Sequence, residues 1–259
     1  MVSPARFRPG PEHREIVVLS GSGLSARTGT GTFRGPDGLW ALAPETERAM
    51  HAELLPDSLP QLWSVWGGMA RIARRHGPTP GHRAIARLGA AVITQNVDAL
   101  HQAAGSEVVC ELHGSALHAV CLGADCAWRG VLEPGEGARA EDHGLPSACP
   151  WCGAPTRPDV VLFGESLPPQ ALELARRLAR RADLFVAVGT SGTVFPAAQL
   201  APLARAHGAT TVLIDIDPPR HAATRAAFDH VIAEDAHEVL PDWERRLHHV
   251  GGTSFLEPF

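Results

Sequence analysis

Short, mostly apolar runs recur along the chain, separated by segments in which apolar residues have helical spacing. Continuous apolarity of this kind is typical of strands buried on both faces of a parallel sheet. The runs are Ile16–Leu19, Ala91–Thr94, Val108–Cys110, Leu184–Val188 and Val212–Ile216. The helical patterns lie at His82–Leu88, Gln170–Arg181 and Phe195–His207. Strands alternating with helices predict an α/β fold with a doubly wound parallel sheet.

Two stretches interrupt this alternation. Residues 42–83 carry a helical pattern rich in Trp and Ala, whereas residues 119–158 are punctuated by Gly and Pro and contain cysteines. We therefore expect a Rossmann-like domain made of residues 1–41, 84–118 and 159–259. The two interrupting stretches then form a smaller inserted domain, which consists of a helical module and a cysteine-bearing module.

Length, charge and composition limit the classes of function. The 259 residues suffice for a sizeable core, and 23 Lys and Arg against 28 Asp and Glu give a net charge of −5. No dense basic run occurs, so nucleic acid is not an expected partner, and the arginines at 176–177 and 180–181 are interpreted as the solvated face of a helix.

The compartment is expected to be the cytoplasm. The N-terminus has no apolar core of the signal-peptide kind, and no run of about 18 apolar residues occurs, so no membrane span is expected. In a cytoplasmic protein, cysteines are more often thiols or metal ligands than disulfides.

Four of the five cysteines form two close pairs. Cys121 and Cys126 are separated by four residues, and Cys149 and Cys152 by two. Two such pairs about 20 residues apart have the spacing of a four-thiolate zinc site. Because four protein ligands leave no open position, we expect the zinc to be structural. Cys110 lies outside the pattern, in an apolar run, and is interpreted as a core residue.

A glycine-rich turn follows the first apolar run. The segment Ser20–Ser25 reads Ser-Gly-Ser-Gly-Leu-Ser, and a strand that leads through such a turn into a helix is a phosphate-binding arrangement. A tight turn without a ligand is the ordinary alternative for a lone Gly-x-Gly.

The turn is accompanied by further motifs in a fixed order. They are Thr32-Phe33-Arg34-Gly35, Thr94-Gln95-Asn96-Val97-Asp98, Leu112-His113-Gly114 and the paired cysteines. With these motifs the chain resembles the sirtuin family over about residues 16–241. The resemblance implies an enzyme that consumes NAD to remove acyl groups from lysine, giving nicotinamide and O-acyl-ADP-ribose.

The resemblance also implies roles for the residues that match the family motifs. His113 would accept a proton from a ribose hydroxyl, while Asn96 and Asp98 would hold the nicotinamide carboxamide. The alternative interpretation of Asn96 and Asp98 is that they cap the helix expected at residues 99–104. The remaining cofactor-binding residues implied are Ser20, Gly21, Ser22, Gly23, Thr32, Phe33, Arg34, Gln95, Gly189, Thr190, Ser191, Asp215 and Ala236. A carboxylate at Asp215 would repel a 2′-phosphate, which favours NAD over NADP.

An acyl-lysine protein or peptide is the implied substrate. We expect its backbone to add as a strand between residues 158–165 and 192–196, a mode that tolerates many sequences. The substrate-binding residues implied are Val161, Phe163, Gly164, Glu165 and Val194.

The acyl group is expected to be neutral. Relatives that accept acidic acyl groups carry Tyr-x-x-Arg on the small-domain helix, and the corresponding positions here are Trp66 and Met69. The chain contains no tyrosine, and an unpaired carboxylate in an apolar tunnel is costly. Acetyl or a longer apolar acyl group is therefore expected at Trp66 and Met69.

Alternatives to protein deacylation remain open from the sequence. Thr30-Gly31 replaces the Ile-Pro of the family, and glycine loosens a loop, which keeps NAD hydrolysis and mono-ADP-ribosyl transfer as readings. The acyl amine could belong to a small molecule. An NAD-responsive binding module without turnover is disfavoured because His113, Asn96 and Asp98 are all present. For the oligomeric state, which the sequence leaves undetermined, a monomer is favoured.

Overall fold

The computed structural model describes residues 7–33, 38–131, 148–219 and 221–251. A six-stranded sheet lies at the centre of the larger lobe, in the order β3-β2-β1-β7-β8-β9 with every pair parallel. Its strands are β1 (Ile16–Ser20), β2 (Ala91–Thr94), β3 (Val109–Glu111), β7 (Leu184–Val188), β8 (Thr210–Ile214) and β9 (His230–Ile232). The prediction of a doubly wound parallel sheet is confirmed.

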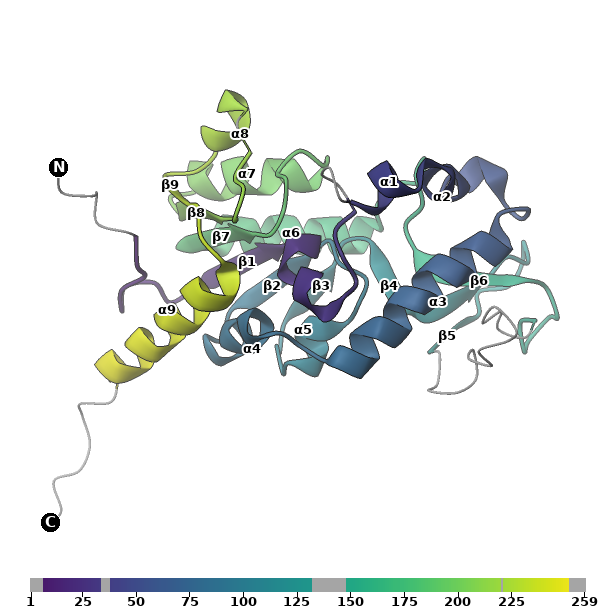
Figure 1. The fold of residues 1–259 in the computed structure, drawn as a ribbon, viewed down its shortest axis with the longest axis horizontal. Coiled ribbons are helices and arrows are strands. Elements are labelled where there is room, and N and C mark those ends of the chain that lie inside the picture. Colours follow the sequence, from purple (N-terminus) through teal and green to yellow (C-terminus); the bar gives the residue numbers. More distant parts are fainter. Residues whose placement is uncertain (1–6, 34–37, 132–147, 220, 252–259) are drawn as a thin grey trace, which may run out of the picture.

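Helices cover both faces of this sheet (Figure 1). They are α4 (Pro80–Arg87), α5 (Leu100–Ala103), α6 (Pro169–Arg181), α7 (Leu200–Ala206) and α9 (Ala236–Gly251). The short helix α8 (Ala222–Arg225) stands beyond α7 at the top of the picture and has no buried residue. Alternate residues of β1 belong to two separate cores. Ile16 and Val18 share a cluster with residues of α4 and α9, whereas Val17 and Leu19 share one with residues of α6 and α7. This two-sided burial explains the continuous apolar runs of the sequence.

The smaller lobe contains an antiparallel sheet in the order β5-β4-β6. Its strands are β4 (Gly114–Cys121), β5 (Arg129–Val131) and β6 (Thr156–Val160), and the long helix α3 (Leu59–His76) packs against β4 and β6. The indole of Trp63 fastens α3 to β6 through a 3.0 Å hydrogen bond to the carbonyl oxygen of Thr156. Two short helices, α1 (Leu39–Leu42) and α2 (Pro44–Ala49), precede α3 at the top of this lobe in Figure 1.

One predicted helix is shorter than its apolar pattern. The segment Phe195–His207 begins with a 3-10 turn at Ala197–Gln199, and the α-helix α7 starts only at Leu200. Pro196 has no N–H to donate, and a residue before proline is disfavoured in the helical region. None of the described helices is apolar over the length that a membrane crossing requires.

Candidate active site

The centre of the large sheet is the point where the chain reverses its direction of progress. From β1 the chain proceeds through β2 to β3 on one side, while β7, β8 and β9 lie on the other. Ligands of open α/β sheets bind outside the carboxyl ends of the strands at such a switch point. Here a cleft of about 700 Å³ is lined by the loops after β1, β2, β7 and β8 together with residues of the smaller lobe. We call it the active-site cleft.

Two glycine-containing turns meet backbone to backbone at the floor of this cleft. The N–H of Gly21 donates to the carbonyl oxygen of Val188, and that of Gly23 donates to Gly189, both over 3.0 Å. A Cβ at Gly21 would lie 2.6 Å from the Gly189 oxygen, and one at Gly23 would lie 2.7 Å from the Gly189 Cα. Glycine is thus required at both positions by the neighbouring turn, in addition to any ligand.

No α-helix follows this turn, so that part of the sequence prediction is wrong. Residues Ser22–Leu24 and Ala26–Thr28 form two successive 3-10 turns, which end at Gly29 with a φ of +85°. The hydroxyls of Thr28 and Thr30 both donate to the Ser25 carbonyl oxygen, at 2.8 and 3.2 Å. This local tethering holds the loop over the cleft despite the glycine at position 31.

Ser25 joins the two polar residues that follow β2. Its hydroxyl donates to Asp98 Oδ2 over 2.6 Å and accepts from Asn96 Nδ2 over 3.1 Å. Asn96 also donates to the carbonyl oxygen of Gly21, and Asp98 Oδ1 accepts from the N–H of Leu100 at 3.0 Å. Asp98 therefore makes the helix-end contact of the alternative interpretation as well as the Ser25 contact. Burial raises the pKa of the Asp98 carboxyl above its ordinary value, against these hydrogen bonds.

His113 is oriented by the backbone of the loop after β2. Its Nδ1 lies 2.9 Å from the carbonyl oxygen of Gln95, so Nδ1 carries the proton and Nε2 has the free lone pair. Burial lowers the pKa of His113, against the effect of the Gln95 carbonyl. The Gln95 side chain donates to Thr190 Oγ1 over 2.8 Å, which ties the loop after β2 to the loop after β7. A neutral imidazole in the cleft can accept a proton.

Most of the predicted cofactor residues line the active-site cleft. They are Gly21, Ser22, Gly23, Thr32, Phe33, Gln95, Asn96, Gly189, Thr190, Ser191, Asp215 and Ala236. Ser20 and Asp98 do not line it. The Ser20 side chain is fully buried and hydrogen-bonded to Thr94 Oγ1 and His101 Nε2, so it stabilises the ends of the strands beneath the cleft lining. Arg34 lies outside the described residues.

The carboxyl end of β8 contributes Asp215 to the same cleft. Its Oδ1 accepts a hydrogen bond of 2.9 Å from the N–H of Asp217, and burial raises its pKa. Ala236, the first residue of α9, also lines the cleft. It follows Asp235, whose carboxylate pairs with Arg27. The Arg27–Asp235 ion pair thus connects the loop after β1 to α9 along the cleft.

The segment after β6 forms one wall of the cleft and includes four predicted substrate residues. Val161 donates its N–H to the His113 carbonyl oxygen at 2.9 Å, and Phe163 pairs in strand fashion with Met50 and Ala52. Glu165 lines the cleft, but its carboxylate is bonded to Arg157 and to the Leu162 N–H, both at 2.8 Å. Each of its two carboxylate oxygens accepts one of these hydrogen bonds, so the Glu165 side chain orders the segment. Gly164 and, from the facing loop, Val194 line the cleft as well.

Aromatic rings close the cleft on the side of the smaller lobe. Phe33 stacks on Trp40 with ring centroids 5.2 Å apart and lies 5.7 Å from Trp66, while Trp40 meets Phe163 edge to face at 6.0 Å. The four rings line the cleft. We call them the aromatic wall. Met69 packs in the same apolar cluster, but of the two positions expected to meet the acyl group only Trp66 lines the cleft.

The four paired cysteines converge at the far end of the smaller lobe. Their sulfurs all lie within 4.8 Å of one another, with Cys121 to Cys152 at 3.4 Å and Cys126 to Cys149 at 3.7 Å. A tetrahedral zinc ion with Zn–S bonds of about 2.3 Å places its sulfurs about 3.8 Å apart. The cluster of four thiols therefore fits a tetrahedral zinc ion. Cys110 is buried in the core of the large sheet, as predicted.

Comparison with known proteins identifies the family. The Sir2 family model matches residues 21–196. NAD-dependent protein deacylase 1 of Pseudomonas aeruginosa is 42% identical over 245 residues, covering 90% of this chain and 94% of that protein. NAD-dependent protein deacylase of Thermococcus kodakarensis is 39% identical over 244 residues, covering 90% and 91%. The chain belongs to the Sir2 family, and the resemblance to sirtuins is confirmed.

Solved structures agree with this assignment. A Sir2 homologue mutant in complex with ADP-ribose superimposes with a TM-score of 0.83 at 31% identity, covering 93% of this chain and 94% of that one. A Sir2 homologue–NAD complex gives a TM-score of 0.79 at 33% identity, covering 91% and 90%. A Sir2 complex with a p53 peptide and NAD⁺ gives 0.71 at 29% identity, covering 94% and 95%.

Sequence reasoning missed several residues of the cleft. Ser25, which supports the site without lining the cleft, stood within the glycine-rich motif. Its contacts with Asn96 and Asp98 gave no signal in the sequence because these residues are 71 and 73 positions away. Trp40, Met50 and Arg27 line the cleft without belonging to a motif. A pattern cannot reveal them, since their place depends on how the smaller lobe packs against the large sheet.

Proposed function

We propose that this protein is an NAD-dependent lysine deacylase that removes a neutral acyl group and gives nicotinamide and O-acyl-ADP-ribose. The observation that carries the proposal is the convergence of two networks on one cleft. His113, with a free Nε2, and Asn96 both line the cleft, and the Asn96 side chain is held by the buried Ser25, which also bonds to Asp98. The related proteins are named NAD-dependent protein deacylases, and related structures hold NAD, ADP-ribose and peptide.

The glycine-rich loop and the loop after β7 would bind the phosphates and ribose of NAD. Ser22, Thr190 and Ser191 line the cleft beside the backbone of the paired turns and offer hydroxyls to these groups. Asp215 would accept ribose hydroxyls, and its negative charge disfavours the 2′-phosphate of NADP. Asn96 and Asp98 would hold the carboxamide of nicotinamide, with Ser25 keeping both side chains in place.

His113 would act as the general base. The acyl oxygen of the substrate attacks the ribose C1′ as the bond to nicotinamide breaks, so nicotinamide leaves with the bonding electrons. The ribose 2′-hydroxyl then attacks the former acyl carbon, and His113 Nε2 removes the hydroxyl proton. Water finally releases the free lysine. The Gln95 carbonyl stabilises the imidazolium that forms, because it accepts a hydrogen bond from Nδ1–H throughout.

The acyl group would lie against the aromatic wall. Arg27 is the one Lys or Arg among the described residues that line the cleft, and it is already paired with Asp235. On α3, Arg71, Arg74 and Arg75 are all exposed to solvent. A carboxylate-bearing acyl group such as succinyl would therefore lose its hydration without gaining a cation. Acetyl, butyryl and longer chains lose no such charge.

The substrate lysine must come from another molecule. All 23 positions counted as Lys or Arg are arginine, so the chain has no lysine of its own to acylate or deacylate. The substrate backbone would add between Val161–Gly164 and Val194, on the side of that segment opposite its pairing with residues 50–52. The enzyme would act in the cytoplasm, where the four zinc-binding thiolates remain reduced.

The test is mass spectrometry of NAD with a panel of acetyl-, butyryl-, myristoyl- and succinyl-lysine peptides, using the full chain and a His113→Ala variant. O-acyl-ADP-ribose from the neutral peptides, lost in the variant, supports the proposal. Free ADP-ribose alone would identify an NAD hydrolase, an ADP-ribosylated target would identify a transferase, and intact NAD with bound ligand would identify a binding module. Each of these three outcomes overturns it. Turnover of a small acyl amine in place of peptides would change the substrate class.

A further inference from the structure

A second cleft lies on the opposite side of the loop after β7 from the active site. It has a volume of about 990 Å³ and is bounded by α6, α7 and α8. Its apolar residues include Leu19, Leu172, Ala187, Leu200, Leu203 and Phe228. We call it the α6–α7 cleft. The volume lies at the upper end of the range of about 300–1,000 Å³ in which proteins hold small molecules.

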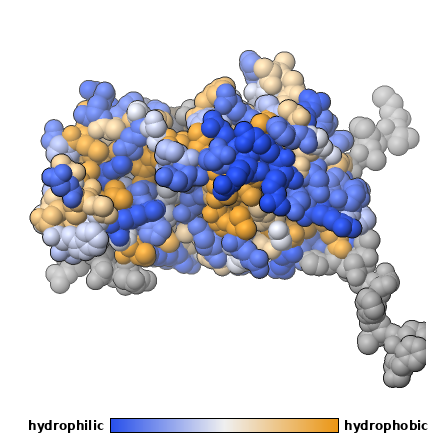
Figure 2. Space-filling model, turned by 180° about the vertical axis from the view of Figure 1, so that it is seen from behind, coloured by the Kyte–Doolittle hydropathy of each residue, from blue (hydrophilic) through white to orange (hydrophobic). Residues whose placement is uncertain are grey.

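Two arginines give the polar rim of this cleft a positive charge. Arg176 and Arg180 stand one helical turn apart on α6. Among the described residues that line the cleft there is no aspartate or glutamate. The chain as a whole has a net charge of −5, so the lack of acidic residues in the cleft lining differs from the overall composition. Seen from behind, where α6 comes to the front, Figure 2 shows a strongly hydrophilic patch beside apolar surface.

The two arginines are not used for holding the fold together. No ion pair is found for Arg176 in the described part of the chain, and Arg180 reaches only Glu173 at 3.8 Å on the exposed helix surface. Arg157 and Arg205, by contrast, contact their carboxylates at 2.8 and 2.9 Å. Arg176 is half-buried and Arg180 is exposed, and both line the cleft, whereas the exposed Arg177 and Arg181 do not.

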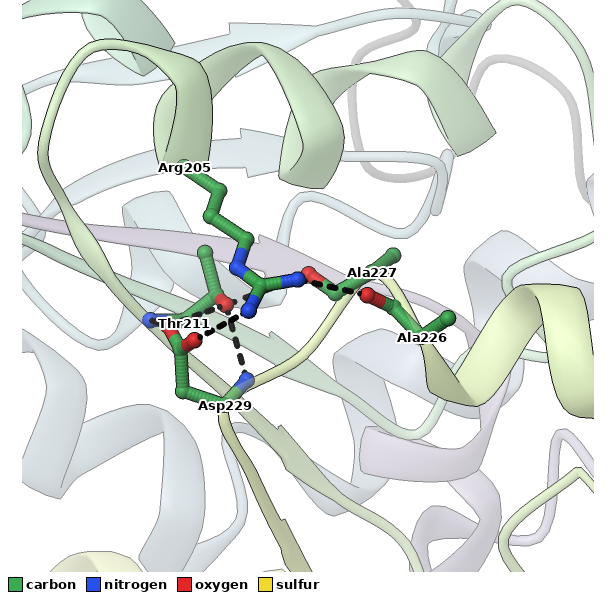
Figure 3. Close-up of polar contacts among 5 residues, drawn as sticks. All are labelled: Arg205, Thr211, Ala226, Ala227 and Asp229. Atoms are coloured by element: carbon green, nitrogen blue, oxygen red, sulfur yellow. Dashed lines mark hydrogen bonds and ion pairs between the residues drawn. The ribbon is translucent and has the colours of Figure 1, made fainter.

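The wall opposite α6 is fixed by a polar network (Figure 3). Arg205 of α7 pairs with Asp229 and donates to the Ala226 carbonyl oxygen at 2.7 Å, and Asp229 exchanges hydrogen bonds with Thr211 of β8. The Thr211 hydroxyl also donates to Ala227 at 3.1 Å. Ala227 and Phe228, which line the cleft, are therefore held in place from behind. Such a cavity is pre-formed and does not depend on a ligand to open it.

We propose that the α6–α7 cleft binds a monocarboxylic acid with an apolar tail, whose carboxylate pairs with Arg176 and Arg180 while the tail lies over Leu172, Leu200 and Phe228. Guanidinium groups match carboxylates through paired, charge-assisted hydrogen bonds, and an apolar floor favours an alkyl chain. Ligand binding in the α6–α7 cleft is independent of deacylation, so a failure to bind the acid would leave the proposed function intact. It is also distinct from the aromatic wall, although Thr190 and Phe195 line both clefts.

Isothermal titration calorimetry of the full chain with decanoate, and with 1-decanol as the uncharged match, tests the proposal. We expect one equivalent of decanoate to bind, with decanol at least about tenfold weaker because it cannot pair with guanidinium. The double variant Arg176→Gln/Arg180→Gln should lose at least about tenfold in decanoate affinity. The matched control Arg177→Gln/Arg181→Gln changes the same charge on the same helix outside the cleft and should bind as the unmodified chain does.

A second variant separates the two clefts. Ala223→Trp adds bulk at an exposed position of α8 that lines the α6–α7 cleft, and it should block decanoate while deacylation of an acetyl peptide continues. Decanoate binding that survives both the double variant and Ala223→Trp, and that an acyl-lysine peptide displaces, would place the ligand in the active site and overturn the proposal. Equal affinity for decanoate and decanol, or no binding of either, would overturn it too.

Discussion

The hydroxyl of Ser25 donates a hydrogen bond of 2.6 Å to the carboxylate of Asp98, joining two segments 73 residues apart. The same hydroxyl accepts from Asn96, so one small side chain organises both groups proposed to hold nicotinamide. Ser25 is buried, and no other donor in the described structure bonds to Asp98 Oδ2. The contact therefore fixes the geometry of both side chains that are proposed to hold nicotinamide.

Ser25→Ala should reduce kcat about 10- to 100-fold, because it removes a buried hydrogen bond to a carboxylate, a contact of about 1.5–3 kcal/mol. Steady-state kinetics with an acetyl-lysine peptide and NAD measures the effect. Ser58→Ala is the matched control, since Ser58 is also a buried serine but its hydroxyl has no partner among the described residues. Equal kcat for the Ser25 variant and the unmodified chain would contradict the role given to Ser25.

Much of the large sheet could be predicted because each of its long strands is buried on both faces. The runs at Ile16, Ala91 and Leu184 all became strands within one residue of their predicted ends. The strand β9 could not be predicted in this way, because His230–Ile232 is too short to show a period and its first residue is exposed. The strand β8 spans Thr210–Ile214, two residues before the predicted range Val212–Ile216 at both ends, and Ile216 is apolar yet 76% exposed beside the cleft.

The candidate site was predictable where a motif is contiguous and not where packing builds it. His113 and Asn96 stand in short motifs, and the structure places both on the cleft. The aromatic wall combines Phe33, Trp40, Trp66 and Phe163 from separate segments, and only the packing of α3 and β6 brings these rings together. Met69 shows that sequence spacing alone does not place a residue on the cleft. It follows Trp66 by three residues on the same helix and packs in the same cluster, but it does not line the cleft.

The pH dependence of the reaction should report the burial of His113. The base must be neutral, and burial lowers the pKa of His113 below the ordinary value of 6.5. The neutral form therefore persists to more acidic pH than for a free histidine. The acidic limb of the kcat/KM profile should have its midpoint below 6.5, and His113→Ala should abolish turnover.

His118→Ala, in a residue that does not line the cleft, should leave the profile unchanged. A midpoint at or above 6.5 would contradict the assignment.

Zinc should be bound at one ion per chain and should hold the smaller lobe together. Cys152→Ser removes one thiolate from the cluster and should lower both the zinc content and the midpoint of thermal unfolding, because structural zinc contributes about 10–16 kcal/mol in small modules. Cys110→Ala changes a cysteine outside the cluster and should keep the full zinc content. Atomic emission spectrometry and differential scanning calorimetry measure the two quantities. Unaltered zinc content in the Cys152 variant would contradict the four-thiolate site.

The aromatic wall should set the preference for neutral acyl groups. In the unmodified chain, kcat/KM for a succinyl peptide should be at least about tenfold below that for a butyryl peptide, because the succinyl carboxylate loses water without meeting a cation. Trp40→Ala removes a ring that contacts both Phe33 and Phe163, and it opens the wall to water. The ratio of butyryl to succinyl activity should therefore fall in this variant.

Trp151→Ala is the matched control, since that indole is 73% exposed and does not line the cleft, and it should leave the ratio unchanged. A succinyl preference in the unmodified chain, or a ratio unaffected by Trp40→Ala, would show that another feature selects the acyl group.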